Sequence, residues 1–127
     1  MEFALTPEQE TLVRTLRMFA RRELGSRSQQ WDKTGEFPWD AWKQMAELGL
    51  FGLRVPSAYG GQEADLVTTG LAIEEIGRGD FSCTYGMQLA ALAGEIIGRN
   101  APEDVRQRWL PPMVSGEAVL AIALTEP

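Results

Sequence analysis

The segment FSCTYGMQLAALAGEII, residues 81–97, decides the fold of this chain. It holds a single charged residue, Glu95, and it follows Asp80, which can cap a helix. Apolar residues cover nearly every side of such a helix, which is typical of a helix that is buried on both sides or that lines a ligand cavity. The amide of Gln88 must find partners there: it forms a hydrogen bond in the core, faces solvent or lies in the wall of a ligand cavity.

Other helices are predicted on the N-terminal side of this segment. The sequence TPEQ at residues 6–9 is typical of a capping box at a helix start, and that helix is expected to end near residues 24–25. Residues 25–37 are predicted to be a connector that lies against the core. A second helix is expected to begin at Pro38, and a third is expected to follow Asp65 as its cap.

The C-terminal part of the chain changes character twice. A fifth helix is predicted from Pro102, with a break at Pro111 and Pro112, because proline lacks an N–H group and its ring clashes with the preceding turn. Residues 118–124, AVLAIAL, then predict a short buried strand. No partner strand is predicted elsewhere in the chain, so the backbone groups of that strand would stay unpaired.

The expected architecture is therefore all-α. About five helices should form an up-and-down, bundle-like domain over residues 1–117. Residues 118–127 should be the first strand of a truncated β-domain and the sequence TEP that follows it. A chain of 127 residues is long enough to bury a substantial core.

The composition excludes several classes of function. Acidic residues outnumber basic ones by 18 to 12, giving a net charge of −6, which argues against nucleic acid or an anionic membrane as a partner. The absence of histidine excludes Ser-His-Asp and Cys-His catalysis and removes the commonest zinc ligand. One cysteine allows no internal disulfide, and no stretch resembles a signal peptide or a membrane span, so a cytoplasmic protein is expected.

No catalytic constellation follows from the residues alone. Glu74 and Glu75 are adjacent on a predicted helix and point in different directions, so they are expected to form a solvated face rather than an acid/base pair. Cys83 has no basic residue within a turn to lower its pKa and is expected to be a small core residue.

Five short motifs follow one another along the chain. They are LTPEQ at 5–9, LGLFG at 48–52 with VPSAYGG at 55–61, EEIGRGD at 74–80, SGE at 115–117 and ALTEP at 123–127. Together they resemble the amino-terminal part of the acyl-CoA dehydrogenase family, and the resemblance covers essentially the whole chain. The TEP sequence corresponds to the family's signature at the start of its β-domain.

The resemblance implies an FAD-dependent enzyme that removes a proton and a hydride from the α and β carbons of an acyl-CoA thioester and leaves the trans-2-enoyl-CoA. The family subunit has an N-terminal helical domain, a middle β-domain and a C-terminal four-helix domain, and this chain matches the first of these. The catalytic glutamate of most members lies in the last domain, so this chain alone is expected to be inactive and to hold no FAD by itself. The resemblance also implies an electron-transfer flavoprotein as acceptor and a homodimer or homotetramer.

Two sets of site residues follow from the same resemblance. Leu124 and Thr125 correspond to positions that contact the flavin ring, and Met87, Gln88 and Leu92 correspond to the far wall of the acyl pocket. Two other functions fit the sequence: a non-catalytic helical interaction module derived from the family, and a flavin-dependent oxidase or hydroxylase with the same fold.

Overall fold

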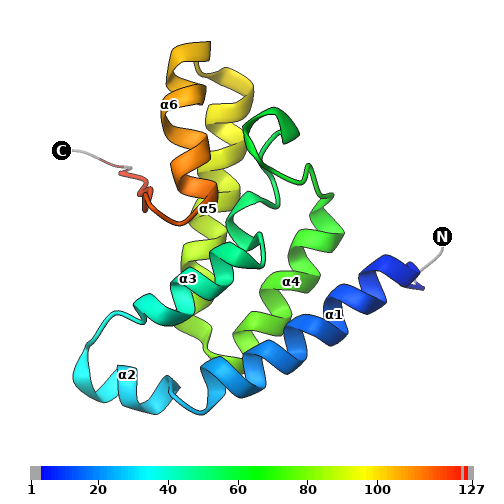
Figure 1. Ribbon diagram of the computed structural model, residues 1–127, viewed down its shortest axis with the longest axis vertical. Coiled ribbons are helices and arrows are strands. Elements are labelled where there is room, and N and C mark those ends of the chain that lie inside the picture. Colours follow the sequence, from blue (N-terminus) through cyan, green and yellow to red (C-terminus); the bar gives the residue numbers. More distant parts are fainter. Residues whose placement is uncertain (1–3, 124, 126–127) are drawn as a thin grey trace.

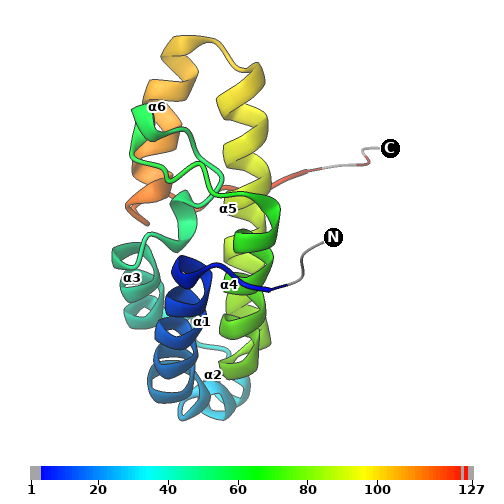
Figure 2. The same cartoon turned by 90° about the vertical axis from the view of Figure 1, so that its right-hand side faces the viewer.

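The computed structural model describes residues 4–123 and 125, and this part of the chain is built of helices without a strand. Figure 1 shows a long central helix, α5, with α4 beside its first half and α6 beside its second half. In Figure 2 the helices form two layers, α4 and α5 in one and α1, α3 and α6 in the other. The all-α prediction is confirmed. The helices are α1 (Pro7–Phe19), α2 (Ser28–Thr34), α3 (Trp39–Glu47), α4 (Leu66–Gly79), α5 (Phe81–Asn100) and α6 (Glu103–Val114).

The capping box predicted at the start of α1 is present. The Gln9 N–H donates to the Thr6 hydroxyl at 3.2 Å, and the Thr6 N–H donates to the Gln9 side chain at 3.1 Å. The helical path continues past α1 through a π-helical turn, η1 (Ala20–Gly25). There the Ala20 carbonyl lies so close to Gly79 of α4 that a Cβ at residue 79 would be 2.5 Å from the oxygen. A glycine is therefore what lets the two helices approach at this point.

The connector predicted at 25–37 contains a helix of its own, so the described residues hold six α-helices where about five were expected. This helix, α2, is held at both ends: the Ser28 hydroxyl donates to Asp80 at 2.6 Å, and Gly35 ends the helix with φ +66°. Trp31 packs against the core from the middle of α2. Such a short helix is stabilised by tertiary contacts rather than by its own propensity, which is why the local sequence did not predict it.

Two acidic caps place α4 and α5. Asp65 accepts a hydrogen bond from the Thr68 N–H at 2.6 Å, and Asp80 accepts one from the Cys83 N–H at 2.8 Å. Only Asp80 separates the two helices, so they turn back on each other and run side by side (Figure 1). Near the other end of α5, Glu95 accepts two hydrogen bonds from Arg54, at 2.8 and 3.1 Å, which tie the loop before α4 to the central helix.

The predicted break of the last helix at Pro111 and Pro112 is wrong. Both prolines lie inside α6, which continues to Val114. Leu110 and Met113, one turn apart, are both buried in the core. Their burial stabilises the helical conformation at Pro111 and Pro112, where the backbone cannot donate hydrogen bonds.

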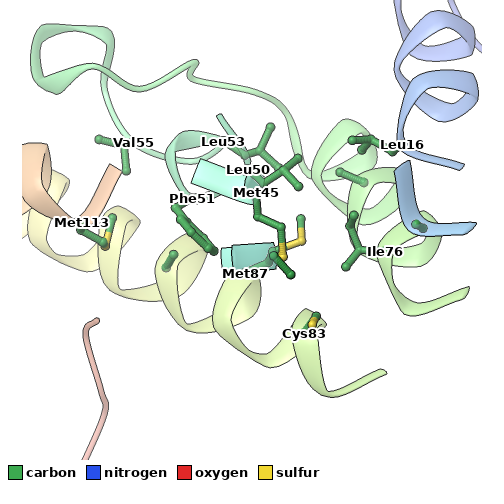
Figure 3. Close-up of a cluster of buried hydrophobic side chains, with 14 of the residues drawn as sticks. Leu16, Met45, Leu50, Phe51, Leu53, Val55, Ile76, Cys83, Met87 and Met113 are labelled. Atoms are coloured by element: carbon green, nitrogen blue, oxygen red, sulfur yellow. The ribbon is translucent and has the colours of Figure 1, made fainter. Parts of the chain in front are cut away.

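The core lies between α5, α4 and the turn after α3, with α1 packed on α4 and α3 packed on that turn (Figure 3). Phe51, Met45 and Met87 lie at its centre, and Ile76 and Leu16 extend it toward α4 and α1. The turn η2 (Leu50–Gly52) contributes buried residues although it is only one turn long. None of the helices described is long and apolar enough to cross a membrane.

Residues 118–123 form no strand in the described structure. The Ala118 N–H donates to the Pro112 carbonyl at 2.9 Å, and Leu120 is partly buried against the core. After Leu120 the chain leaves the helices (Figures 1 and 2). The strand expected at 118–124 would need a neighbouring strand to pair with its backbone groups, and none is present among the described residues. Leu124 lies outside the described residues, and the domain boundary after residue 117 stays a prediction.

Candidate functional site on the outer face of α5

One side of α5 carries large apolar side chains in solvent. Phe81 is 80% exposed, Tyr85 65%, Leu92 52% and Ile96 49%. Gln88 is exposed between them, and spacings of three and four residues place all five side chains on one stripe of the helix. We call these five residues the outer face of α5. Apolar side chains recurring over four turns are a larger feature than the scattered exposed apolar residues of ordinary surfaces.

The opposite side of α5 is buried. Cys83, Met87, Ala90 and Gly94 face the core, and Met87 is among its most buried side chains (Figure 3). The sequence of this helix is apolar on almost every side because the helix has two apolar faces. One face lies in the core, and the other is exposed to solvent. Exposure of an apolar face to water is unfavourable in free energy, and contact with a ligand or another domain removes that exposure. The outer face of α5 is therefore suited to such a contact.

The three residues proposed for an acyl pocket are divided between these two sides. Gln88 and Leu92 lie on the outer face, and Met87 lies in the core. Successive residues of a helix point about 100° apart, so Met87 and Gln88 lie on different sides of α5 in this chain, and their assignment to one pocket stays a prediction. Of the three alternatives for Gln88, a hydrogen bond in the core is excluded, because its side chain is exposed in this chain.

A cavity of about 570 Å³ adjoins the start of the outer face. Side chains of α2, α3 and α5 line it, together with the turn at residues 35–38, and it is partly open to solvent. Phe81 and Tyr85 belong both to the outer face and to the wall of this cavity. We call it the aromatic cavity, because its wall also includes Trp31, Phe37 and Trp42.

Cys83 lies at the wall of the aromatic cavity but is not a reactive thiol. Burial, together with the negative charge of Asp80 and a hydrogen bond to it, raises the pKa of Cys83 to about 12. A thiol with that pKa is almost entirely protonated at neutral pH and is a poor nucleophile. The prediction that Cys83 is a small core residue is confirmed.

The pair Glu74–Glu75 does not form the solvated face that was predicted. Glu75 is buried, with 3% of its surface exposed, and accepts hydrogen bonds from Arg17 at 2.7 and 2.9 Å. These hydrogen bonds lower the pKa of Glu75, against the opposing effect of burial. Glu74 pairs with Arg78 at the surface. The ion pair between Glu75 and Arg17 joins α4 to α1. The two residues are 58 positions apart in the sequence, so no local sequence pattern could predict that they pair.

Of the two residues proposed to contact a flavin, Thr125 belongs to the part of the chain that the structure describes. Thr125 is exposed and has φ +66°, a backbone conformation that β-branched residues rarely adopt. Its partner in that proposal, Leu124, lies outside the described residues. Before this segment, the Trp42 indole N–H donates to the Gly116 carbonyl at 3.0 Å and fixes the point from which the chain leaves the helices.

A comparison with protein families decides the identity. Residues 6–117 match the model of the acyl-CoA dehydrogenase N-terminal domain. This chain belongs to the acyl-CoA dehydrogenase family. The resemblance stated from the sequence motifs is confirmed.

Curated relatives in the family carry several activities. The chain is 36% identical to the probable acyl-CoA dehydrogenase YngJ of Bacillus subtilis, over 100% of this chain and 34% of the relative. It is 39% identical to the 3-(aryl)acrylate reductase of Clostridium sporogenes, over 94% of this chain and 32% of the relative. The chain thus spans about a third of the length of the relatives it matches.

Solved structures of the family superimpose on this fold. The butyryl-CoA dehydrogenase of Megasphaera elsdenii matches with a TM-score of 0.88 and 25% identity, over 100% of this chain and 34% of that chain. A glutaryl-CoA dehydrogenase in complex with glutaryl-CoA matches with a TM-score of 0.86 and 29% identity, over 92% of this chain and 31% of that chain.

Proposed function

We propose that this acyl-CoA dehydrogenase domain is the N-terminal helical part of an FAD-dependent enzyme acting on an acyl-CoA thioester. The observation that carries the proposal is the outer face of α5, an apolar stripe that nothing in the described chain covers. The relatives of this chain are about three times as long as the chain itself, so they have further residues that can close a pocket over this face. Gln88 and Leu92 would form one wall of the acyl pocket, and Met87 would support that wall from the core.

The reaction proposed for the whole enzyme needs a base that removes a proton from the substrate, and this base is not a residue of this chain. A carboxylate elsewhere in the subunit takes the proton from the α carbon, the hydride leaves the β carbon, and the product is the 2-enoyl-CoA. FAD would supply the two-electron acceptor for that hydride. The described residues offer this chemistry a binding wall and water exclusion, which hold the acyl chain in one orientation.

The fit of FAD to this chain is partial. The exposed hydroxyl of Thr125 and the backbone of the segment after Gly116 can donate and accept hydrogen bonds at one edge of a flavin ring. They surround no cofactor by themselves. We therefore propose that Leu124 and Thr125 touch the ring only when the β-domain of the complete subunit pairs with residues 118–124.

Direction, electron carrier and assembly belong to the same proposal. Two relatives are named as reductases, the 3-(aryl)acrylate reductase and an acryloyl-CoA reductase (NADH) of Anaerotignum propionicum that is 32% identical, so the complete enzyme is proposed to work in either direction. An electron-transfer flavoprotein is the proposed carrier, and a homodimer or homotetramer is the proposed assembly. A cytoplasmic location stays a prediction, compatible with the one free, buried thiol of Cys83.

The test is a visible absorption spectrum of the purified protein, recorded with its intact mass. We expect a complete subunit, about three times this length, with a flavin band that bleaches when an acyl-CoA is added. A band that returns when the reduced enzyme meets an enoyl-CoA would show the reverse reaction. A native polypeptide that is longer than this chain but colourless, and that takes up no FAD, would contradict the proposal and favour the non-catalytic interaction module. The 127-residue chain of 14.1 kDa is expected to be colourless in either case.

A further inference from the structure

The aromatic cavity is large enough to hold part of a substrate. Its volume is about 570 Å³. An apolar cavity of about 150 Å³ inside a protein is enough to bind benzene. The aromatic cavity is partly open to solvent, unlike that closed cavity, and its volume is sufficient for a six-membered ring and the carbons that link it to a thioester.

Its wall is suited to a ring rather than to a flexible chain. Trp31 of α2, Phe37 and Trp42 line it, together with Phe81 and Tyr85 of α5. Aromatic side chains favour edge-to-face and offset contacts with another ring, at about 0.5–1.5 kcal/mol beyond simple burial. The rings of Phe37 and Trp42 already make such a tilted contact, with centroids 5.6 Å apart.

The end of the cavity is shaped by one glycine and one tryptophan. A Cβ at Gly86 would overlap the ring of Trp42, so the indole lies directly on the backbone of α5. Trp42 is fixed there by its hydrogen bond to Gly116 and by its contact with Phe51, whose ring centroid is 4.1 Å away. A ring fixed on both sides makes a rigid end wall.

The charges around the cavity disfavour acyl groups that end in a second carboxylate. Asp32, Glu36 and Asp80 are the charged residues of its wall, and all three are acidic. Arg27 lies over the ring of Trp31, 4.9 Å from its centroid, and is paired with Asp40 at 3.5 Å. A carboxylate tail would meet like charges here, whereas a neutral ring would not.

From these observations we propose that the aromatic cavity receives the ring of an aryl-substituted acyl group, such as 3-phenylpropanoyl, whose thioester lies further along the outer face of α5. The inference rests on the proposed function and adds the substrate class to it. Phe81 and Tyr85 connect the two surfaces, so an acyl chain following the outer face toward the start of α5 ends in this cavity.

The test uses the complete, flavin-loaded subunit and measures flavin reduction by three thioesters: butyryl-CoA, 3-phenylpropanoyl-CoA and glutaryl-CoA. We expect kcat/KM to be at least about tenfold higher for 3-phenylpropanoyl-CoA than for the other two. Trp fluorescence on titration of the oxidised enzyme with cinnamoyl-CoA gives a second readout that does not depend on turnover, because Trp31 and Trp42 line the cavity.

Ser82→Phe fills the cavity from an exposed position of its wall and is expected to lower the ratio of kcat/KM for 3-phenylpropanoyl-CoA over butyryl-CoA by about tenfold. Ser57→Phe makes the same exchange at an exposed position outside the cavity and should leave the ratio unchanged. Because serine at both positions is exposed, neither exchange requires the core to expand.

The outcomes separate the two proposals. No bleaching with any thioester would overturn both. Bleaching with butyryl-CoA but not with 3-phenylpropanoyl-CoA, or a preference for glutaryl-CoA, would overturn only the aryl substrate class. A lower Tm for Ser82→Phe with an unchanged ratio would also overturn it, because it would show that the rest of the polypeptide fills the cavity.

Discussion

At the scale of single residues, Gly61 marks the closest backbone approach in the loop between α3 and α4. A Cβ there would overlap the carbonyl of Val55, which is backbone and cannot move aside as a flexible side chain would. Gly61→Ala should therefore lower the free energy of unfolding by about 3 kcal/mol, measured by urea denaturation.

Gly70 is the matched control for that exchange. It lies within α4, and a Cβ there would meet nothing within 4 Å. Gly70→Ala should raise the free energy of unfolding by about 1 kcal/mol, because alanine has the higher helix propensity. Equal effects at the two positions would show that the close approach at Gly61 is not a constraint.

The buried carboxylate of Glu75 should make stability depend on pH. Its hydrogen bonds with Arg17 lower its pKa below the ordinary value of 4.5, so the folded protein takes up this proton less readily than the unfolded chain. The contribution of the pair is thus fully present above pH 4.5 and is lost as pH falls through the lowered pKa of the folded state. Glu75→Gln should lower the free energy of unfolding by about 1 kcal/mol at pH 7.

The measurement is urea denaturation of both proteins from pH 7 to pH 3. The difference between Glu75→Gln and the native sequence should shrink as the pH falls below 4.5. Glu74→Gln, at the exposed position next to it, should change stability much less at every pH. A difference that grew toward low pH would contradict the assignment.

At the scale of whole elements, the residue that caps α5 should contribute more to the stability of the fold than the residue that caps α4. Asp80 is nearly buried and accepts hydrogen bonds from both Cys83 and Ser28, so it caps α5 and holds the start of α2 as well. Asp65 caps α4 at an exposed site. Asp80→Ala should cost about 2 kcal/mol and Asp65→Ala about 1 kcal/mol.

Thermal unfolding followed by circular dichroism checks this order. Asp80→Asn, which keeps an acceptor oxygen at the cap, should recover most of the lost stability. The order would be contradicted by equal losses at Asp65 and Asp80, since that would mean the hydrogen bond between α2 and α5 contributes nothing.

At the scale of the molecule, the outer face of α5 should make the 127-residue chain associate with itself. Leu92 and Ile96 are half exposed on that face, and apolar contact between copies would remove them from water. Leu92→Glu should shift sedimentation velocity toward the monomer and lower the binding of a hydrophobic dye. Val67→Glu, at a similarly exposed position of α4 outside this face, should change both less.

Much of the fold could be predicted because its signals are local. The capping box at Thr6, the caps at Asp65 and Asp80 and the apolar run of α5 each lie within one or two turns of chain, where propensity and hydrogen bonding act directly. The helix α2 and the passage of α6 through two prolines could not be predicted, because burial of residues far apart in sequence stabilises them.

The sequence by itself determined that the chain is helical, that α5 is its apolar centre and, through five ordered motifs, that it resembles the acyl-CoA dehydrogenases. Only the tertiary structure decided that Met87 faces the core while Gln88 and Leu92 face outward, and that Glu75 is a buried ion-pair partner rather than a solvated one. The physical reason is that a helix apolar on every side gives no periodic signal for which side is covered. That choice depends on the elements that pack against it from distant parts of the chain.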